Sequence, residues 1–259
     1  MHDPLRRLVR GVLARLGARP HSRFSGAYPD WETARRDSDG WDSPAVLDKV
    51  RAGVLDVLQG RSAYERDGTS FAALPRADTL RRLLSRLATA DSWIIDFGGG
   101  LGGTWINNRD ILPPGVRFTV IEQPSFCEAG RRIAADHGLP VQFSTSVEAL
   151  GEQGKPDVVI FSGVLSYVED WERIVAAVLR LEPANIVVDR QILTAEDGYV
   201  CTQRVTGYYA RPVSYPLRVF NEERFVAAFA GYGIRQRWVS DFDPPDHLGF
   251  HFVKAANGR

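Results

Sequence analysis

The chain has 259 residues, of which 44% are hydrophobic and 25% charged, and its 32 basic and 32 acidic side chains give a formal net charge of zero. These values are typical of a globular protein with one large domain, or with one domain and an appended cap. A nucleic-acid-binding protein is disfavoured, because a neutral chain has no overall field that attracts a polyanion. The two cysteines, Cys127 and Cys201, lie far apart without metal-ligand spacing. We therefore expect reduced thiols, no metal site and a cytoplasmic protein.

The amino-terminal segment departs from this charge balance. In "DPLRRLVRGVLARLGARP", leucines and valines recur at helical spacing, and five arginines accompany a single aspartate. A basic amphipathic helix of this kind can lie on an anionic membrane, or it can pack on its own domain with its arginines solvated. Both interpretations stay open, so peripheral contact with the inner membrane surface accompanies the cytoplasmic prediction.

Residues 1–90 are predicted to form this helix and a helical cap. The segment after Pro20 is rich in Ser, Gly, Asp and aromatic residues, and it has too many large rings, Tyr28 among them, for a solvated linker. Apolar residues then recur at three- and four-residue intervals over 45–58 and 77–88, which predicts two helices.

From Trp93 onward, short β-branched segments alternate with helical patterns. We predict strands at 93–97, 116–123, 141–145, 157–163 and 185–190, and helices at 125–137, 171–181 and 222–232. Strands separated by helices form a parallel sheet that is covered on both faces. The tail adds "RQRWVSDF" and "GFHFVKAA", joined by a turn at Pro244 and Pro245, which should pair antiparallel. Residues 91–259 are thus predicted to be a Rossmann-like α/β domain with a mostly parallel seven-stranded sheet and a terminal antiparallel hairpin, the class I methyltransferase plan.

The segment "SWIIDFGGGLGGTW" runs from the first of these strands into five glycines within six residues. Glycines at such a bend admit positive φ and let a ligand contact the main chain. Gly98, Gly100 and Gly103 match the dinucleotide fingerprint G-x-G-x-x-G. Asp96, Gly98, Gly100 and Gly102 instead match D-x-G-x-G-x-G, the loop that holds S-adenosylmethionine (SAM).

Two observations favour SAM over a dinucleotide, and a third suits either cofactor. About 90 residues precede the loop, whereas the dinucleotide fingerprint usually follows the first strand of its domain. Asp96 would repel a pyrophosphate but suits the ammonium end of the methionine moiety. Glu122 ends the second strand about 20 residues beyond Gly102, where a carboxylate can accept both ribose hydroxyls.

Further cofactor contacts are expected at the same edge of the sheet. Ser162 and Gly163, after the fourth strand, should offer main-chain groups beside the methionine moiety. Ser146 and Val147, after the third strand, should face the adenine, although Ser and Thr also cap helices at such positions. The predicted cofactor-binding residues are Asp96, Gly98, Gly99, Gly100, Glu122, Gln123, Ser146, Val147, Ser162 and Gly163.

Six segments carry a resemblance to a known family. "FSGAYPDWETA", "IIDFGGGLGG", "VIEQP", "FSGVLSYVED", "VVDR" and "SYPLRVFNEERF" occur in this order, between Phe24 and about Phe225. Together they resemble a family of SAM-dependent methyltransferases, many of them encoded among bacterial surface-polysaccharide and lipopolysaccharide genes. The resemblance implies the fold above and methyl transfer in polysaccharide biosynthesis, with a glycan or another small molecule as acceptor.

Candidate acceptor residues follow the fifth strand, at the edge where open α/β sheets bind ligands. Asp189 could accept a hydroxyl proton and Arg190 could bind a phosphate or carboxylate, or the two could form a structural ion pair. Tyr167 either borders the transferred methyl group or belongs to the core. His251 alternates with hydrophobic neighbours in "GFHFV", so it should point to the opposite face from them and is another candidate base.

Residues 194–220 are long for a connection in this fold and are rich in tyrosine and arginine. We predict a lid over the acceptor, with a homodimer surface as the alternative. The candidate substrate-binding residues are Tyr28, Arg190, Tyr208, Tyr215 and Arg218.

The sequence therefore predicts a SAM-dependent methyltransferase that acts on a small molecule or glycan, with O-methylation as the simplest chemistry. One alternative keeps SAM but runs another reaction, such as a cyclisation that releases methylthioadenosine. The other is a catalytically degenerate scaffold with a SAM fold, associated with a membrane.

Overall fold

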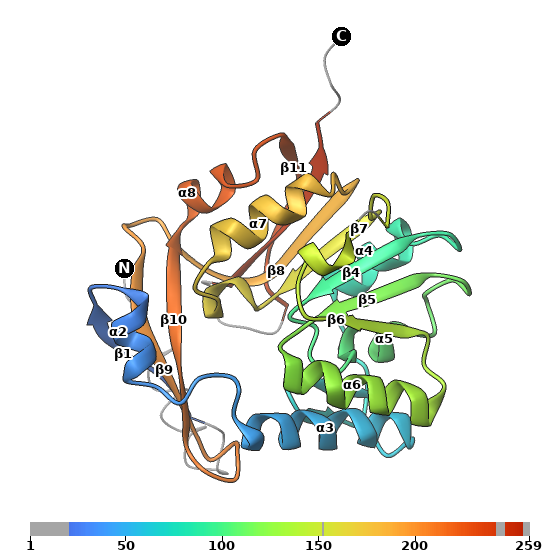
Figure 1. Ribbon diagram of the computed structural model, residues 1–259, viewed down its shortest axis with the longest axis horizontal. Helices are drawn as coiled ribbons and strands as arrows, with labels where there is room; N and C mark the ends of the chain where they lie inside the picture. Colours follow the sequence, from blue (N-terminus) through green and yellow to red (C-terminus); the bar gives the residue numbers. More distant parts are fainter. Residues whose placement is uncertain (1–20, 152, 242–246, 256–259) are drawn as a thin grey trace.

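The computed structural model describes residues 21–151, 153–241 and 247–255. Within them, one large mixed sheet carries helices on both of its faces (Figure 1). The strands of this sheet are β1 (His21–Tyr28), β4 (Trp93–Phe97), β5 (Arg117–Ile121), β6 (Val141–Ser144), β7 (Val158–Ser162), β8 (Asn185–Thr194), β9 (Tyr199–Thr206), β10 (Val213–Asn221), β11 (Tyr232–Val239) and β12 (His247–Lys254). The short strands β2 (Tyr64–Arg66) and β3 (Thr69–Phe71) form a separate hairpin.

Seven of these strands reproduce the sheet that the sequence predicts. Their order is β6-β5-β4-β7-β8-β12-β11, in which β4 to β8 are parallel neighbours and β12 runs antiparallel to both β8 and β11. The mostly parallel α/β fold with a terminal antiparallel pair is thereby confirmed. The turn that we expected at Pro244 and Pro245 lies outside the described residues.

The helices among the described residues are α2 (Trp31–Arg36), α3 (Pro44–Leu58), α4 (Thr79–Leu87), α5 (Gly103–Asn108), α6 (Pro124–His137), α7 (Trp171–Arg180) and α8 (Glu222–Ala227), with short 3-10 turns η1 (Glu148–Leu150) and η2 (Leu165–Tyr167). Four helices lie close to their predicted positions, α8 ends five residues before its predicted end, and α2 and α5 were not predicted. Local chemistry sets several of the ends. Asp78 caps α4 by accepting a hydrogen bond from the backbone N–H of Arg81, and Gly138 ends α6 in the left-handed conformation.

The sheet continues beyond the seven predicted strands. Past Arg190, β8 turns toward β10 and pairs with it in parallel, β10 pairs antiparallel with β9, and β9 pairs antiparallel with β1. The region 194–220, which we expected to be a lid, therefore consists largely of sheet. Within residues 21–90, where we expected a helical cap, the structure has α2, α3 and α4, but β1 joins this extension and β2 and β3 form a hairpin beside α3. The predicted amino-terminal basic helix lies outside the described residues.

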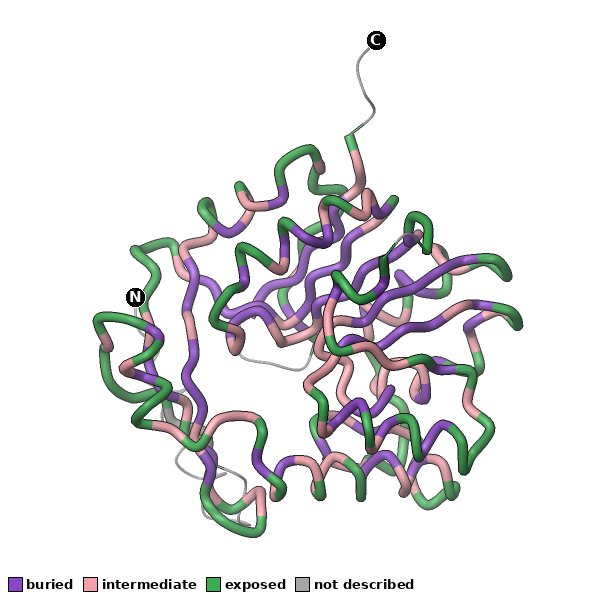
Figure 2. Tube along the Cα trace, viewed as in Figure 1, coloured by how far each residue is buried: buried purple, intermediate pink, exposed green. Residues whose placement is uncertain are grey.

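Successive side chains of the central strands alternate between the two faces of the sheet and pack against the helices on each face. Ile95, Phe161 and Val188 pack on one face against α7 and α8, while Ile94, Ile160 and Val187 pack on the other face with α4. A third apolar cluster joins α3, α5 and α6 to β9 and β10. Figure 2 shows the central strands buried along most of their length and the outward turns of the helices exposed. No helix among the described residues is long and apolar enough to cross a membrane.

Candidate functional site

The carboxyl ends of β4, β5, β7 and β8 open into a cavity of about 390 Å³, which we call the first cavity. Parallel α/β sheets characteristically bind ligands at this edge. Its wall comes from the glycine loop after β4, the ends of the strands, α3 and the β2–β3 hairpin. The predicted residues on this wall are Asp96, Gly98, Gly99, Gly100, Glu122, Gln123, Ser162, Gly163, Tyr167, Asp189 and Arg190.

The glycine loop adopts a conformation that larger residues would disrupt. Gly98 has φ +74°, and a Cβ on it would lie 2.4 Å from Val164 Cγ2. A Cβ on Gly99 would lie 2.3 Å from Asp96 Oδ2. Gly100 also has positive φ, but a Cβ there would meet only Val50 Cγ1, at 3.8 Å. The loop is thus packed tightly behind Gly98 and Gly99, while Gly100 borders open space in the cavity.

Asp96 lies beneath this loop and is only 1% exposed. Among the described residues, its Oδ2 atom is buried without a hydrogen-bond partner. Burial raises the pKa of Asp96 to about 7, against the smaller opposing effect of a hydrogen bond with Thr104. A buried carboxylate oxygen without a hydrogen-bond partner lowers the stability of the folded protein. Because Asp96 lines the cavity, a cationic or hydrogen-bonding ligand could supply the missing partner.

Glu122 follows β5 and presents a second carboxylate to the first cavity. Its Oε2 accepts a hydrogen bond from the backbone N–H of Gln123 at 2.8 Å. Burial raises the pKa of Glu122 to about 7; the bond from Gln123 lowers it, and the negative charges of Asp96 and Asp42 raise it further. Asp96 and Glu122 therefore lie close enough to interact, as expected for the ends of two adjacent parallel strands.

The structure places the two predicted adenine contacts, Ser146 and Val147, away from the first cavity. Val147 is buried in the core beneath η1, and the hydroxyl of Ser146 accepts a hydrogen bond from the backbone N–H of Ala149, which caps that turn. Neither residue lines the first cavity, whereas Thr145, one residue earlier, does. A capping hydroxyl is the alternative that the sequence left open at this position.

Asp189 and Arg190 both reach the first cavity, although successive strand residues normally face opposite sides. Arg190 has φ +59°, and the pairing of β12 with β8 shifts register between Leu248 and Phe250. This irregularity acts as a bulge, which redirects side chains and is common beside functional sites. Asp189 Oδ1 accepts a hydrogen bond from Trp238 Nε1 at 3.0 Å, and Arg190 pairs with Asp67.

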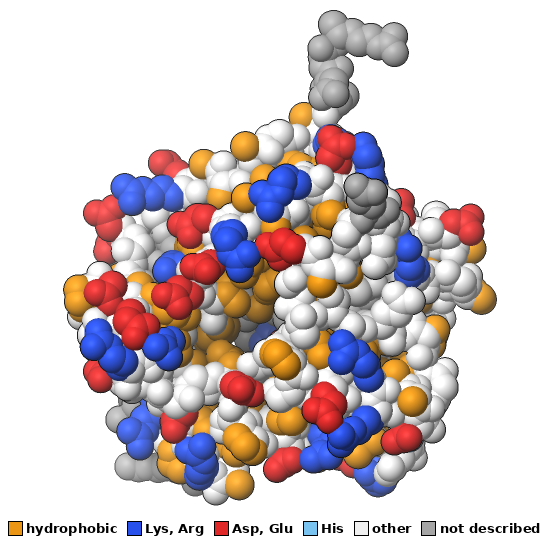
Figure 3. Space-filling view, viewed as in Figure 1, with side chains coloured by type: hydrophobic (Ala, Val, Ile, Leu, Met, Phe, Trp, Pro, Cys, Tyr) orange, Lys and Arg blue, Asp and Glu red, His pale blue; other side chains and the backbone are white. Residues whose placement is uncertain are grey.

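A second cavity, of about 340 Å³, adjoins the first. Seven residues line both cavities and form what we call the neck: Trp41, Arg66, Asp67, Gly163, Tyr167, Arg190 and Tyr209. Tyr208 and Tyr215 from the sheet extension line the second cavity, together with Gln203, which accepts a hydrogen bond from the Tyr167 hydroxyl at 2.6 Å. Figure 3 shows this face of the molecule hollowed near its centre, with hydrophobic side chains around the hollow.

Aromatic rings form much of the second cavity's wall. Trp41 stacks on Tyr215 with ring centroids 4.0 Å apart, and Tyr167 meets Trp41 edge-on at 5.1 Å. Within the described residues, the buried side-chain nitrogen and oxygen atoms without a hydrogen-bond partner are Trp41 Nε1, Tyr215 Oη and Asp96 Oδ2. All three residues line one or both cavities, so these partnerless side-chain atoms converge on this site.

Three other candidate residues lie away from both cavities. His251 points to the opposite face from Phe250 and Phe252, as predicted, but it pairs with Val187 near the start of β8 and its Nε2 bonds with Asn185 Oδ1 at 2.9 Å. The antiparallel direction of β12 thus carries His251 away from the ligand edge. Tyr28 lies on the outermost strand β1, and Arg218 lies on the face of β10 opposite to Tyr215, where it donates to the Glu169 carbonyl. The structure therefore does not bring these three candidate residues to the cavities.

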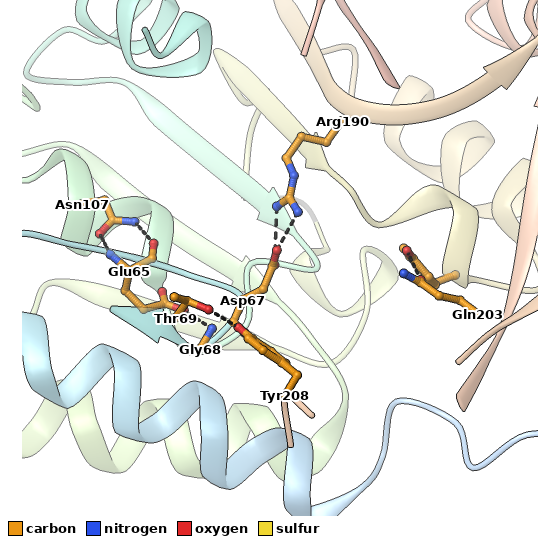
Figure 4. A network of polar contacts seen from close by, with 9 residues as sticks. Glu65, Asp67, Gly68, Thr69, Asn107, Arg190, Gln203 and Tyr208 are labelled. Atoms are coloured by element: carbon orange, nitrogen blue, oxygen red, sulfur yellow. Dashed lines mark hydrogen bonds and ion pairs between the residues drawn. The ribbon is translucent and has the colours of Figure 1, made fainter. Parts of the chain in front are cut away.

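The β2–β3 hairpin contributes residues to the site that were not predicted from the sequence. Asp67 and Gly68 both have positive φ and form its two-residue turn, so the Asp-Gly pair in "YERDGTSF" was a recognisable hairpin signal. Glu65 and Asp67 of this hairpin line the first cavity, and Figure 4 shows Asp67 and Arg190 pointing toward one another. Trp41 was likewise missed as part of the wall.

No protein-family model matches this sequence, and no curated protein matches it. Solved structures do share its fold. DesVI of Streptomyces venezuelae aligns with a TM-score of 0.52 at 14% identity, covering 81% of this chain and 97% of that one. The N-terminal domain of EvdMO1 with SAH bound gives 0.51 at 16% identity, covering 82% and 96%.

The Burkholderia thailandensis 1,6-didemethyltoxoflavin-N1-methyltransferase, solved with 1,6-didemethyltoxoflavin and S-adenosylhomocysteine, aligns over 93% of this chain and 98% of its own. Its TM-score is 0.50 at 16% identity. At such identities the likeness concerns the fold, and it agrees with the strand order described above. The chain has the Rossmann-like fold of class I SAM-dependent methyltransferases.

Proposed function

We propose that this protein is a SAM-dependent methyltransferase that methylates a small-molecule acceptor, most simply at a hydroxyl oxygen. One observation carries the cofactor part of this proposal. A left-handed glycine loop, the buried Asp96 carboxylate with its partnerless oxygen, and the buried Glu122 carboxylate together line a cavity at the carboxyl ends of β4 and β5. Solved structures with this fold are named as methyltransferases or contain the demethylated product of SAM.

The residues of the first cavity suit SAM as follows. Glu122 would accept hydrogen bonds from the ribose hydroxyls, with Gln123 and Thr145 toward the adenine. Asp96 and the glycine loop would hold the methionine moiety, beside Ser162 and Gly163. When bound, SAM supplies a methyl group that is activated for transfer by its sulfonium.

The second cavity would hold the acceptor. Its volume of about 340 Å³ is in the range of small-molecule sites, and its aromatic wall would exclude water from the reacting groups. Much of methyl-transfer catalysis is alignment of this kind. Asp189 at the edge of the first cavity would take the proton from an acceptor hydroxyl, and Arg190 in the neck would orient an anionic group on the acceptor.

The cofactor assignment is tested by calorimetry with SAM, S-adenosylhomocysteine and NAD. We expect both sulfur compounds to bind and NAD not to bind. Binding of NAD without SAM would overturn the proposal. Release of S-adenosylhomocysteine, rather than methylthioadenosine, in a pool of candidate acceptors would separate methyl transfer from cyclisation.

The wider setting of the reaction is part of the same proposal. The sequence resemblance supports a glycan acceptor in bacterial polysaccharide biosynthesis, and the arginine-rich amino terminus supports a cytoplasmic enzyme at the inner membrane surface, with homodimerisation as a further proposal. Deletion of residues 1–19 should release the protein from anionic vesicles while SAM binding persists. Equal vesicle binding by the truncated protein would contradict the membrane role.

A further inference from the structure

Glu65 is a buried carboxylate that the roles above leave unused. It lies on β2, is only 5% exposed and lines the first cavity. Asn107 on α5 clamps its backbone: Asn107 Oδ1 accepts from the Glu65 N–H at 3.1 Å, and Asn107 Nδ2 donates to the Glu65 carbonyl at 2.7 Å. The helix that follows the glycine loop therefore fixes the position of Glu65 (Figure 4).

The two carboxylate oxygens of Glu65 have different surroundings. Oε1 accepts a hydrogen bond from the backbone N–H of Gly68, within the turn of the hairpin. Oε2 lies 2.8 Å from the place that a Cβ on Gly103 would occupy, at the first residue of α5. The hairpin thus supplies a hydrogen-bond donor for Oε1. Oε2 is held against the end of the glycine loop, on the wall of the cavity.

No cation within the described residues compensates this charge directly. Glu65 forms no ion pair there; Arg66 and Arg190 act on it only through longer-range attraction, and Asp67 repels it. Burial raises the pKa of Glu65 to about 7. Asp96 and Glu122 on the same cavity wall also lack a basic partner among the described residues. Burying three acids around one cavity costs folding free energy when no cation compensates their charge, and a cationic ligand would offset that cost.

We propose that Glu65 binds the α-ammonium group of SAM through Oε2, which rests on the proposed function above. The ammonium carries three N–H donors, and a carboxylate is the acceptor that makes the strongest hydrogen bond with it. Arg66 and Arg190 line the same cavity, so both signs of charge are available for a zwitterionic amino-acid group. Glu122 is assigned to the ribose hydroxyls, and Asp96 lies beneath the glycine loop. Glu65 instead reaches the cavity from the β2–β3 hairpin.

The test compares three ligands that differ in charge. SAM has a sulfonium and an ammonium, S-adenosylhomocysteine has the ammonium alone, and 5′-methylthioadenosine has neither. Glu65→Gln should weaken SAM and S-adenosylhomocysteine by about 10- to 100-fold in calorimetry, the range for losing a charge-assisted hydrogen bond. Methylthioadenosine should bind with wild-type affinity, which also shows that the variant is folded.

Glu122→Gln is the matched control, because it removes a carboxylate from the same cavity but should weaken all three ligands through their common ribose. Three results would overturn the proposal: equal effects of Glu65→Gln on all ligands, no effect on any, or an effect on SAM alone, which would place Glu65 at the sulfonium. If the wild-type protein binds none of the three, the proposed function falls as well. Should Glu65→Gln fail to fold, Glu65→Asp keeps the negative charge on a side chain one methylene shorter. It should likewise weaken SAM and S-adenosylhomocysteine but not methylthioadenosine.

Discussion

Asp67 and Arg190 form an ion pair in the neck between the two cavities, with Arg190 Nη2 2.6 Å from Asp67 Oδ2, although 123 residues separate them in sequence. Both residues have positive φ, Asp67 in the hairpin turn and Arg190 in the bulge of β8. The hydroxyl of Tyr208 also bonds to the Asp67 carbonyl. Two locally strained segments are thus joined to each other at the place where the cavities meet, which is where strain is commonly retained for function.

The strain at Arg190 predicts an unusual order of stabilities. Arg190→Ala and Arg190→Gly both lose the ion pair, but only alanine must keep a side chain at φ +59°. The glycine variant should therefore be more stable than the alanine variant by about 1 kcal/mol in urea unfolding. Arg204, exposed on β9, is the control: there alanine should be the more stable of the two, since glycine weakens a regular strand. If the alanine variant is more stable than the glycine variant at Arg190 as well as at Arg204, Arg190 is not strained.

Gly100→Val should abolish SAM binding, because the new side chain enters the cavity at a backbone conformation that β-branched residues disfavour. Gly138→Val is the matched control for strain. Gly138 has φ +63°, with nothing within 4 Å of the position of a Cβ, and it ends α6 away from the cavities. Both variants should lose stability in thermal unfolding, but Gly138→Val should retain SAM affinity in calorimetry. Normal SAM binding by Gly100→Val would contradict the role of the loop.

Asp189→Asn should lower methyl-transfer turnover by about 10²- to 10⁴-fold, the usual effect of removing a positioned base. SAM affinity should barely change, and the bond from Trp238 Nε1 can persist because asparagine retains Oδ1. Turnover, SAM affinity and melting temperature are measured on one preparation. Trp238→Phe, which removes the donor and keeps the carboxylate, should have the smaller effect on turnover. A stable, SAM-binding Asp189→Asn variant with wild-type turnover would remove Asp189 from the mechanism.

The three buried acids predict that the unliganded protein loses stability as the pH rises toward 7. Glu65, Asp96 and Glu122 have folded-state pKa values of about 7, above the ordinary values of 4.5 for Glu and 3.8 for Asp. The folded protein therefore binds more protons between these values. Their contribution to stability is fully present below about pH 4 and is lost as the pH rises through 7.

Urea unfolding between pH 5 and 8 measures this slope, and Glu122→Gln should flatten it because one group no longer titrates. SAM should stabilise the protein more at pH 8 than at pH 5.5, since binding is favoured when the acids are charged. Stability that rises with pH over this range, or a slope unchanged in Glu122→Gln, would contradict the assignment.

Local patterns in the sequence were sufficient to predict the central sheet and the positions of two acids at its edge, Asp96 and Glu122. The strand predicted at 93–97 coincides with β4, because an apolar segment ending in glycines is a local signal. Asp96 and Glu122 could be placed near one another without a structure, since they stand at the ends of adjacent parallel strands, whose carboxyl ends meet at one edge.

The tertiary structure alone decided the rest of the site. The pairing of β1 with β9, the bulge that turns both Asp189 and Arg190 into the cavity, and the approach of Glu65 and Asp67 to the glycine loop all join segments far apart in the chain. His251 shows the same limit, because alternation predicted its face correctly but not its distance from the ligand edge. Such contacts depend on how strands align with distant partners, and register between distant segments leaves no periodic signal in either segment.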